Sequence, residues 1–232
     1  MKRKYLLLAL CLVAALAFWR GWVLLNEGRE AETESLQKVS NLIASGTERK
    51  ILILYFSQGD NSRAGAGVEA SSSASIAYWN GELTGNAGII ARMIRENVGG
   101  RLFPILTKQK YPITYEAAAP IGIAEKLAKM RPELSSHIDN LNEYNTVFLV
   151  YPTWWYKMPT PLYTFFDEFD LSGKVIYVCV TSNQNGFTNE LNEIRKMEPE
   201  AEVIRGLSFQ TEETMKAKPA IDKWLDEIKA SW

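Results

Sequence analysis

The stretch Asn145–Pro161, NTVFLVYPTWWYKMPTP, decides the fold of this chain. It begins with an apolar run, Thr146–Tyr151, that is typical of a parallel strand buried on both faces. The strand ends at Pro152, and two tryptophans and a tyrosine follow at positions 154–156. Aromatic side chains just past the carboxyl end of such a strand lie where open α/β sheets bind ligands. Two interpretations stay open here: a stacking surface for a flat ligand, or a plug at the end of the core.

Outward from this stretch, short apolar strands alternate with helical patterns. The predicted strands are Lys50–Ser57, Arg101–Leu106, Thr146–Tyr151, Lys174–Thr181 and Glu202–Leu207. The predicted helices are Gly85–Asn97, Pro120–Lys129, Leu162–Phe169, Thr188–Met197 and Glu212–Ala230. Strands that alternate with helices form βα units, and such units build a parallel sheet. The sequence therefore predicts a three-layer α/β domain in which five parallel strands lie between two layers of helices.

The 232 residues divide into three predicted regions. Residues 1–25 begin with the basic MKRK and continue into an apolar run, as in an export signal or a membrane anchor, and both alternatives stay open. Either one would place the globular part outside the inner face of the cytoplasmic membrane, and an uncleaved anchor would associate the chain with that membrane. Residues 26–48 are polar and acid-rich and are predicted to form a linker. Residues 49–232 are predicted to form one domain that can bury a full core.

Composition narrows the classes of function. The net charge is −1, and removal of residues 1–17 takes away three bases, leaving 23 bases against 27 acids, or −4. This mildly acidic balance argues against nucleic acid as the main partner. Cys179 is the only cysteine after residue 48, so the domain has no internal disulfide and no cysteine-based metal site. The only histidine, His137, lies in a polar segment and is predicted to be at the surface. We predict neither a catalytic side chain nor a metal ligand.

Three loops are predicted to leave the carboxyl ends of strands and to meet at one edge of the sheet: residues 57–86, 152–158 and 182–187. The first loop ends in Thr84-Gly85-Asn86-Ala87-Gly88 and opens a helix. Small residues let backbone N–H groups approach an anion, and the helix dipole favours negative charge there. Ser57, Thr84 and Asn86 can add neutral donors, without any need for Lys or Arg. The alternative is an ordinary helix cap made by Thr84 or Asn86.

The loop after the fourth strand, TSNQNGF, is rich in side-chain amides. Asn183, Gln184 and Asn185 can donate hydrogen bonds to the rim of a heteroaromatic ring. The alternative is a plain connection whose helix is capped by Asn185 or Thr188. Taken together, the three loops offer anion donors, aromatic faces and amides at a single edge.

Over residues 50–209, the order of these motifs resembles the order found in the flavodoxin-like flavoproteins. The most specific part is the block YPTWWYKMPTPLYTFFDEFDLSGK, which follows ILILYFS and the Gly-Asn start of a helix. The resemblance implies a flavodoxin-like doubly wound sheet of strand order 2-1-3-4-5 that binds FMN. It implies that the phosphate is held by Ser57, Gln58, Thr84, Gly85, Asn86 and Ala87. It implies that the ring lies between Pro152, Thr153, Trp154, Trp155, Tyr156 and Lys157 on one side and Ser182, Asn183, Asn185, Gly186 and Phe187 on the other.

Two departures from the family pattern concern the first loop. Ala87 stands where the family has a hydroxyl residue, and residues 60–83 form an insertion before the Gly-Asn pair. Within the insertion, Ile76–Trp79 followed by Asn80-Gly81 predicts a short hairpin. The hairpin is either a lid that brings Tyr78 or Trp79 over the ligand or a tolerated surface loop.

The resemblance implies an FMN-dependent oxidoreductase or electron-transfer protein that meets a redox partner or reduces quinones or other small acceptors. A charge at Lys157 close to the flavin would favour its anionic reduced form. A second class of function stays open, namely a binding or sensory module that keeps the fold without tight FMN binding.

Overall fold

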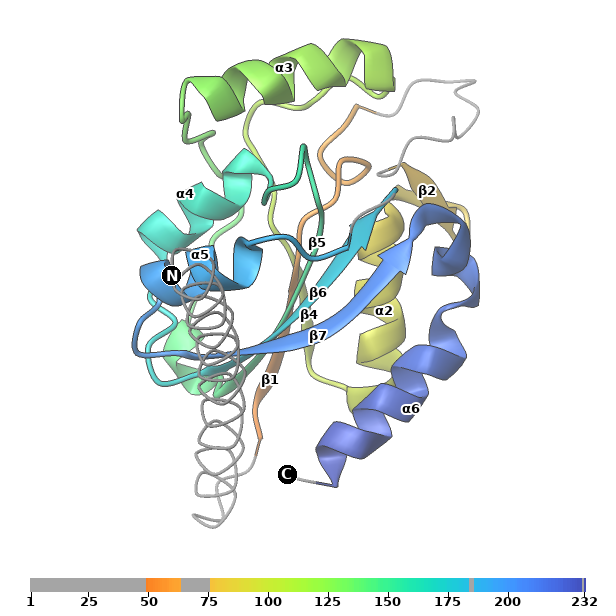
Figure 1. Ribbon diagram of the computed structural model, residues 1–232, viewed down its shortest axis with the longest axis vertical. Coiled ribbons are helices and arrows are strands. Elements are labelled where there is room, and N and C mark those ends of the chain that lie inside the picture. The colour runs from red at the N-terminus through yellow and green to blue at the C-terminus, as the bar shows by residue number, and fades with distance from the viewer. Residues whose placement is uncertain (1–48, 64–75, 184–185, 231) are drawn as a thin grey trace, which may run out of the picture. The chain divides into compact units, whose positions relative to one another are not determined.

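The computed structural model describes residues 49–63, 76–183, 186–230 and 232 of the chain. Glu48–Ala230 form one compact unit, and Figure 1 shows it as a sheet between two layers of helices. The predicted export signal or anchor, the predicted linker and residues 64–75 of the insertion lie outside the described residues. Within the described part, no helix combines the length and apolar character needed to cross a membrane.

Five strands form the sheet, and all neighbouring pairs are parallel. They are β1 (Ile51–Tyr55), β4 (Arg101–Pro104), β5 (Thr146–Pro152), β6 (Val175–Ser182) and β7 (Glu202–Gln210). Their order in the sheet is β4-β1-β5-β6-β7. Counted among these five strands, that order is 2-1-3-4-5, so the predicted topology is confirmed. Every residue of β1, β5 and β6 is buried, which is why these strands are continuous apolar runs in the sequence.

Helices cover both faces of the sheet (Figure 1). On one face lie α2 (Asn86–Val98) and α6 (Lys218–Lys229), which pack against each other. On the other lie α4 (Thr160–Glu168) and α5 (Glu190–Met197), and α3 (Tyr115–Leu127) packs on α4 near the carboxyl edge.

Two predicted helices differ from the structure by more than two residues at their amino ends. The predicted helix Glu212–Ala230 is divided into a 3-10 turn, η2 (Thr211–Lys216), and α6, whose first turn contains a proline. Proline lacks an N–H and has a fixed φ, so it suits the start of a helix and not its middle. Conversely, α3 begins before Pro120 and contains it. The carbonyl of Glu116 that Pro120 leaves without a donor belongs to an exposed residue, where water can replace the lost bond.

The insertion carries the predicted hairpin. Its strands are β2 (Ala77–Trp79) and β3 (Glu82–Thr84), which pair antiparallel. Asn80 and Gly81 both have positive φ, 50° and 83°, as the two-residue turn requires. The hairpin leads directly from the insertion into the start of α2.

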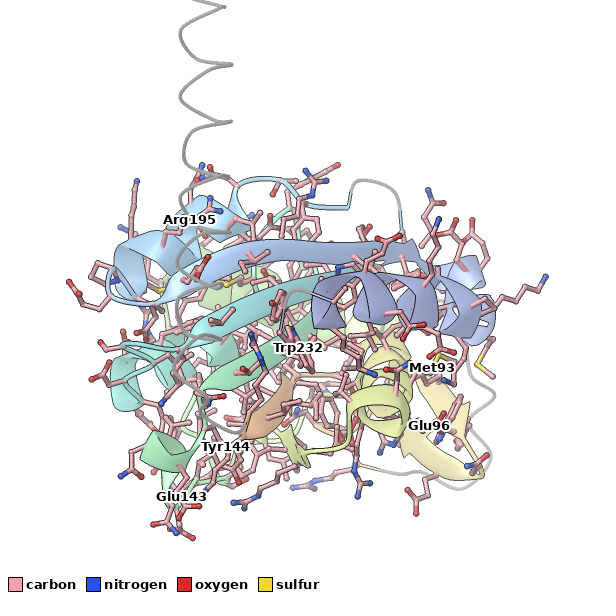
Figure 2. The ribbon with its side chains drawn as sticks, turned by 90° about the horizontal axis from the view of Figure 1, so that it is seen from below. Met93, Glu96, Glu143, Tyr144, Arg195 and Trp232 are labelled. Atoms are coloured by element: carbon pink, nitrogen blue, oxygen red, sulfur yellow. The ribbon has the colours of Figure 1, made fainter. Side chains whose placement is uncertain are left out.

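The amino edge of the sheet is the end seen in Figure 2. Lys174 donates to the carbonyl oxygen of Tyr144 (2.8 Å), and Lys50 pairs with Glu143 at 3.7 Å.

His137 is exposed, as predicted. Cys179 is buried in the centre of β6, and its burial raises the pKa of the thiol to about 12, so the thiol stays protonated and is no nucleophile at neutral pH.

Candidate functional site

The loops that follow β1, β5 and β6 meet at the carboxyl edge of the sheet. Phe56, directly after β1, packs edge-on against Trp154, with ring centroids 5.4 Å apart. Thr188, from the loop after β6, donates through Oγ1 to the carbonyl oxygen of Tyr156 (2.7 Å). The loop after β5 therefore contacts both of the others, so the three loops meet at this edge as expected.

Residues 154–157 form a tight turn, here called the aromatic turn. The N–H of Trp154 donates to the carbonyl of Lys157 (2.8 Å), and the N–H of Lys157 donates back to Trp154 (3.1 Å). Trp155 and Tyr156 have positive φ, 48° and 64°, a region that bulky side chains rarely adopt. Such strain persists only where surrounding contacts enforce it, and it is concentrated at functional sites.

Helix α3 and the loop after β6 hold the aromatic turn in this conformation. Lys126 donates through Nζ to the carbonyl of Trp155 (2.8 Å), as Thr188 does to that of Tyr156. The ring of Trp155 lies directly over Gly122, where an added Cβ would be 2.6 Å from ring atoms. Both central carbonyls of the turn are thus anchored to neighbouring elements.

The three aromatic residues of the turn have different environments. One of them plugs the end of the core, and another offers a surface for stacking, so each interpretation of the sequence holds for a different residue. Trp154 packs edge-on against Phe56 and Tyr111 and closes the end of the core. Trp155 covers α3, whereas Tyr156 is 62% exposed and offers its ring to solvent. The exposed aromatic surface therefore comes from Tyr156 more than from Trp154.

A buried carboxylate that the sequence analysis does not single out lies under the aromatic turn. Glu125 of α3 is only 8% exposed, and it accepts hydrogen bonds from the hydroxyls of Tyr111 (3.0 Å) and Thr160. Burial, and then the charge of Glu125, raise the pKa of the Tyr111 phenol well above its usual range. Tyr111 is therefore a fixed donor, and its ring is held in place against Trp154. The only sequence signal is the position of Glu125 on the inner side of a helix.

In the first loop, the hydroxyls predicted to hold a phosphate converge on a carboxylate of the chain itself. Ser57 and Thr84 both donate to Oδ2 of Asp60, each at 2.5 Å. The hydroxyl of Tyr55 donates to Oδ1 at 2.9 Å. The alternative that Thr84 or Asn86 caps α2 is wrong, because Gly85 is the N-cap residue and no described side chain caps the helix. The hydroxyl of Thr84 is directed to Asp60 instead.

A cation also lies at this cluster, contrary to the expectation of neutral donors alone. Arg92 is 3.9 Å from Oδ1 of Asp60, and it donates to Oγ1 of Thr84 (3.1 Å) and to the carbonyl of Gly88 (3.0 Å). Its guanidinium lies over the ring of Tyr55, 5.5 Å from the centroid. The signal in the sequence is spacing: Arg92 is four residues after Gly88, on the same face of α2 as the start of the helix.

Two glycines allow the first loop to approach β3 and α2 closely. A Cβ on Gly59 would lie 1.5 Å from the carbonyl oxygen of Thr84, and one on Gly88 would lie 2.0 Å from its Oγ1. The side chain of Asn61 donates to the carbonyls of Ser57 (3.0 Å) and Ile105 (2.9 Å), which fixes the backbone beyond Asp60.

The predicted phosphate residues are not all alike in the structure. Ser57, Thr84 and the start of α2 at Gly85, Asn86 and Ala87 lie around the Asp60 cluster. Gln58, by contrast, donates its amide to the carbonyl of Pro112 (3.0 Å) and is engaged away from that cluster.

In the loop after β6, most described polar groups already have partners. Ser182 accepts through Oγ from the N–H of Gly186 (2.9 Å), and Asn183 accepts from the hydroxyl of Thr211 (2.6 Å). The ring of Phe187 is covered by Arg205, 4.9 Å from its centroid. Gln184 and Asn185 lie outside the described residues.

The predicted cap of the next helix is wrong as far as Thr188 is concerned. The N-cap residue of α5 is Asn189, again without a side-chain cap among the described residues. Thr188 uses its hydroxyl to hold the aromatic turn instead.

Lys157, at the end of the aromatic turn, does not present an isolated charge. It forms an ion pair with Glu193 of α5, whose other oxygen accepts from the hydroxyl of Tyr163 (2.7 Å). In the described part of the chain, no group of three or more His, Cys, Asp or Glu side chains is arranged to hold a metal ion.

A five-stranded parallel sheet of this order, with its loops meeting after β1, β5 and β6, defines the flavodoxin-like fold. Comparison with known proteins agrees. The model of the family described as Flavodoxin matches residues 117–228. No curated protein matches the chain.

Several solved structures share this fold, and the alignment with this chain covers nearly the whole length of each of them. A candidate flavoprotein from Bacteroides eggerthii DSM 20697 has 24% identity and a TM-score of 0.56, over 78% of this chain and 99% of its own. One from Bacteroides uniformis ATCC 8492 has 20% identity and a TM-score of 0.55 over the same shares. A flavoprotein in complex with FMN from Lactobacillus acidophilus NCFM has 15% identity and a TM-score of 0.51, over 77% and 99%.

Proposed function

We propose that this chain binds FMN at the carboxyl edge of its sheet and acts as a flavodoxin-like oxidoreductase or electron-transfer protein. The observation that carries the proposal is the juxtaposition of two features at one edge. One is a cluster of anion donors beside the start of α2, and the other is the aromatic turn, which contacts the end of β1 through Trp154. A phosphate and a flat ring are the two ends of FMN. The structural similarity to a flavoprotein in complex with FMN supports the same ligand.

The residues present fit the two ends of FMN. Ser57, Thr84 and Arg92 supply hydroxyl and guanidinium donors, which form charge-assisted hydrogen bonds with a phosphate. The exposed ring of Tyr156 supplies a face for offset stacking. When bound, FMN accepts one or two electrons, and the protein contributes binding, orientation and electrostatics.

We propose further that the electrons go to a redox partner or to a small acceptor such as a quinone. The charge of about −4 without residues 1–17 is modest for a carrier that is steered to a basic partner, which favours a small acceptor. The basic and apolar pattern of residues 1–25 supports a location at the outer side of the cytoplasmic membrane.

A second candidate is a binding or sensory module without tight FMN binding. The observation that favours it is the Asp60 carboxylate, which accepts the hydrogen bonds that a phosphate would need. Each missing hydrogen bond to a charged group weakens binding by about 1.5–3 kcal/mol. Because Asp60 already occupies these donors, the affinity for FMN decides between the two candidate functions.

The visible spectrum of the purified chain, with and without added FMN, tests these two candidates. FMN binding gives flavin absorbance that stays with the protein through gel filtration. We expect Ser57→Ala to weaken FMN binding by less than about tenfold, because the lost donor serves Asp60 in the free protein as well as the phosphate. Ser135→Ala, an exposed serine outside the site, is the matched control. Colourless protein that ignores added FMN would favour the second candidate.

A further inference from the structure

The Asp60 carboxylate lies where the donors of the candidate phosphate site converge. We propose that Asp60 is a displaceable internal ligand of this anion subsite, so that a phosphate group binds by taking over the donors that Asp60 holds. The inference rests on the proposed function for the identity of the phosphate carrier. The position of the carboxylate itself is independent of that function.

The donor set around Asp60 is that of a site for one anion. Three hydroxyls, from Tyr55, Ser57 and Thr84, donate to its two oxygens at 2.5–2.9 Å. Arg92 adds a positive charge 3.9 Å away. Hydroxyls and a guanidinium are the donors that also bind phosphate, because a carboxylate and a phosphate monoester offer similar anionic oxygens.

The start of α2 strengthens the preference for negative charge at this position. A Cβ on Gly88, in the first turn of α2, would lie 3.2 Å from Oδ2 of Asp60, so the carboxylate is beside the positive end of the helix. One anion is stabilised here, but two anions at the same donors would repel each other at close range. A phosphate and the Asp60 carboxylate therefore exclude each other.

The loop is built so that the Asp60 side chain can leave while the backbone stays. Asn61 anchors the next residue through bonds to Ser57 and Ile105, and its Oδ1 accepts from the N–H of Thr107 (2.7 Å). The Asp60 side chain keeps 13% of its surface exposed, which gives it a path to solvent. Its release requires a rotamer change and not an opening of the loop, and a phosphate re-forms the lost hydrogen bonds.

The competing arrangement makes the opposite prediction. If Asp60 only orients Ser57 and Thr84 for a phosphate that binds elsewhere, loss of its charge would disorder the donors and weaken phosphate binding. If Asp60 competes, loss of its charge strengthens phosphate binding.

The first experiment compares FMN with riboflavin, which has the same ring without the phosphate. In the full chain, Asp60→Asn keeps the size and one acceptor oxygen but removes the charge. We expect the FMN dissociation constant to fall about tenfold, with riboflavin affinity unchanged, in flavin fluorescence titrations. Asp226→Asn, an exposed aspartate on α6, is the matched control and should change neither. A weaker affinity for FMN, or an equal change for both flavins, would overturn the proposal.

The second experiment uses inorganic phosphate and needs no flavin. A ligand that binds only the native state raises the melting temperature. We expect phosphate, against chloride at matched ionic strength, to stabilise Asp60→Asn more than the wild type. Equal stabilisation of both, or of neither, would overturn the proposal. If no variant binds either flavin, the proposed function fails while the phosphate result still decides the role of Asp60.

A third variant guards against a failure of Asp60→Asn to fold. Asp60→Ser leaves space at the donors together with one hydroxyl. The same two comparisons, FMN against riboflavin and phosphate against chloride, then decide the proposal.

Discussion

The loop after β1 and the aromatic turn after β5 lie at the same edge of the sheet, yet they are held by different forces. The first loop is fixed by hydrogen bonds and charge, with Asp60 at the centre of three hydroxyls and Arg92. The aromatic turn is fixed by packing on α3 and by two bonds to its carbonyls, against unfavourable φ angles at Trp155 and Tyr156.

The comparison shows how a binding edge can combine two kinds of rigidity. Hydrogen-bonded donors can exchange one acceptor for another at little cost, so the first loop can pass from a carboxylate to a phosphate. A strained turn cannot exchange its contacts in this way, because the neighbouring residues impose its conformation. We therefore expect substitutions in the first loop to change its close packing and its binding of a charged phosphate. Substitutions around the aromatic turn should change the conformation of the turn and its contact with a flat ring.

The largest effect is expected for Gly59→Ala. Its Cβ would lie 1.5 Å from the backbone carbonyl of Thr84, and backbone cannot yield as a side chain can. We expect a loss of about 3 kcal/mol in the free energy of unfolding, measured by urea denaturation. Gly81→Ala is the control, because that position is open but has positive φ, and it should cost only about 1 kcal/mol. Equal costs at both positions would mean that the first loop is not closely packed.

A smaller effect is expected for Gly122→Ala under the aromatic turn. Its Cβ would lie 2.6 Å from the Trp155 ring, which can tilt away. Overpacking costs about 1–3 kcal/mol, and the higher helix propensity of alanine offsets up to about 1 kcal/mol. We expect a net loss of about 1 kcal/mol together with a changed tryptophan emission spectrum. Ala124→Gly should cost a similar amount without the spectral change, and an unchanged spectrum in Gly122→Ala would contradict the contact.

Tyr156→Gly is expected to separate strain from ligand binding. Glycine adopts the φ of 64° without steric cost, but its greater freedom in the unfolded state offsets most of that gain, so stability should change by less than about 1 kcal/mol. FMN affinity should fall about twofold to twelvefold, because a stacking face worth about 0.5–1.5 kcal/mol is lost. Flavin fluorescence titration measures this. Unchanged FMN affinity would mean that the exposed ring does not stack on the flavin.

The smallest effect is expected for Lys157→Ala on the flavin midpoint potential. Lys157 is paired with Glu193, so its charge acts on the flavin only in part. Loss of the lysine leaves the carboxylate, which disfavours the anionic reduced flavin, and we expect a more negative two-electron midpoint by on the order of 10 mV. The double variant Lys157→Ala with Glu193→Gln should return toward the wild-type potential. A redox titration in which neither variant shifts would refute this.

Much of the fold can be predicted from the sequence because its three central strands, β1, β5 and β6, are buried on both faces. A strand such as β5 is a continuous apolar run, and Pro152 marks its end. The hairpin β2–β3 follows from Asn80-Gly81, two residues that accept positive φ. Helix ends are predicted less well, because a proline usually marks the start of a helix, yet Pro120 lies inside the exposed helix α3.

The candidate site is predicted only in outline. Local residues indicate that Ser57 and Thr84 are donors, but their shared acceptor depends on contacts between residues 24 positions apart. Asp60 and Arg92 meet only because the first loop packs against the start of α2 in the folded chain. No local pattern in the sequence specifies that approach.

By itself the sequence determined the strands and their alternation with helices, because burial and periodicity are local properties of the chain, whereas the order of the strands followed from the family resemblance. The tertiary structure alone decided which side chains face one another at the carboxyl edge of the sheet. It directed the hydroxyls of Ser57 and Thr84 to Asp60, added the charge of Arg92, and left Tyr156 as the exposed aromatic face. Hydrogen bonds and charge pairs act over a few ångströms, and only the folded chain brings distant residues within that range.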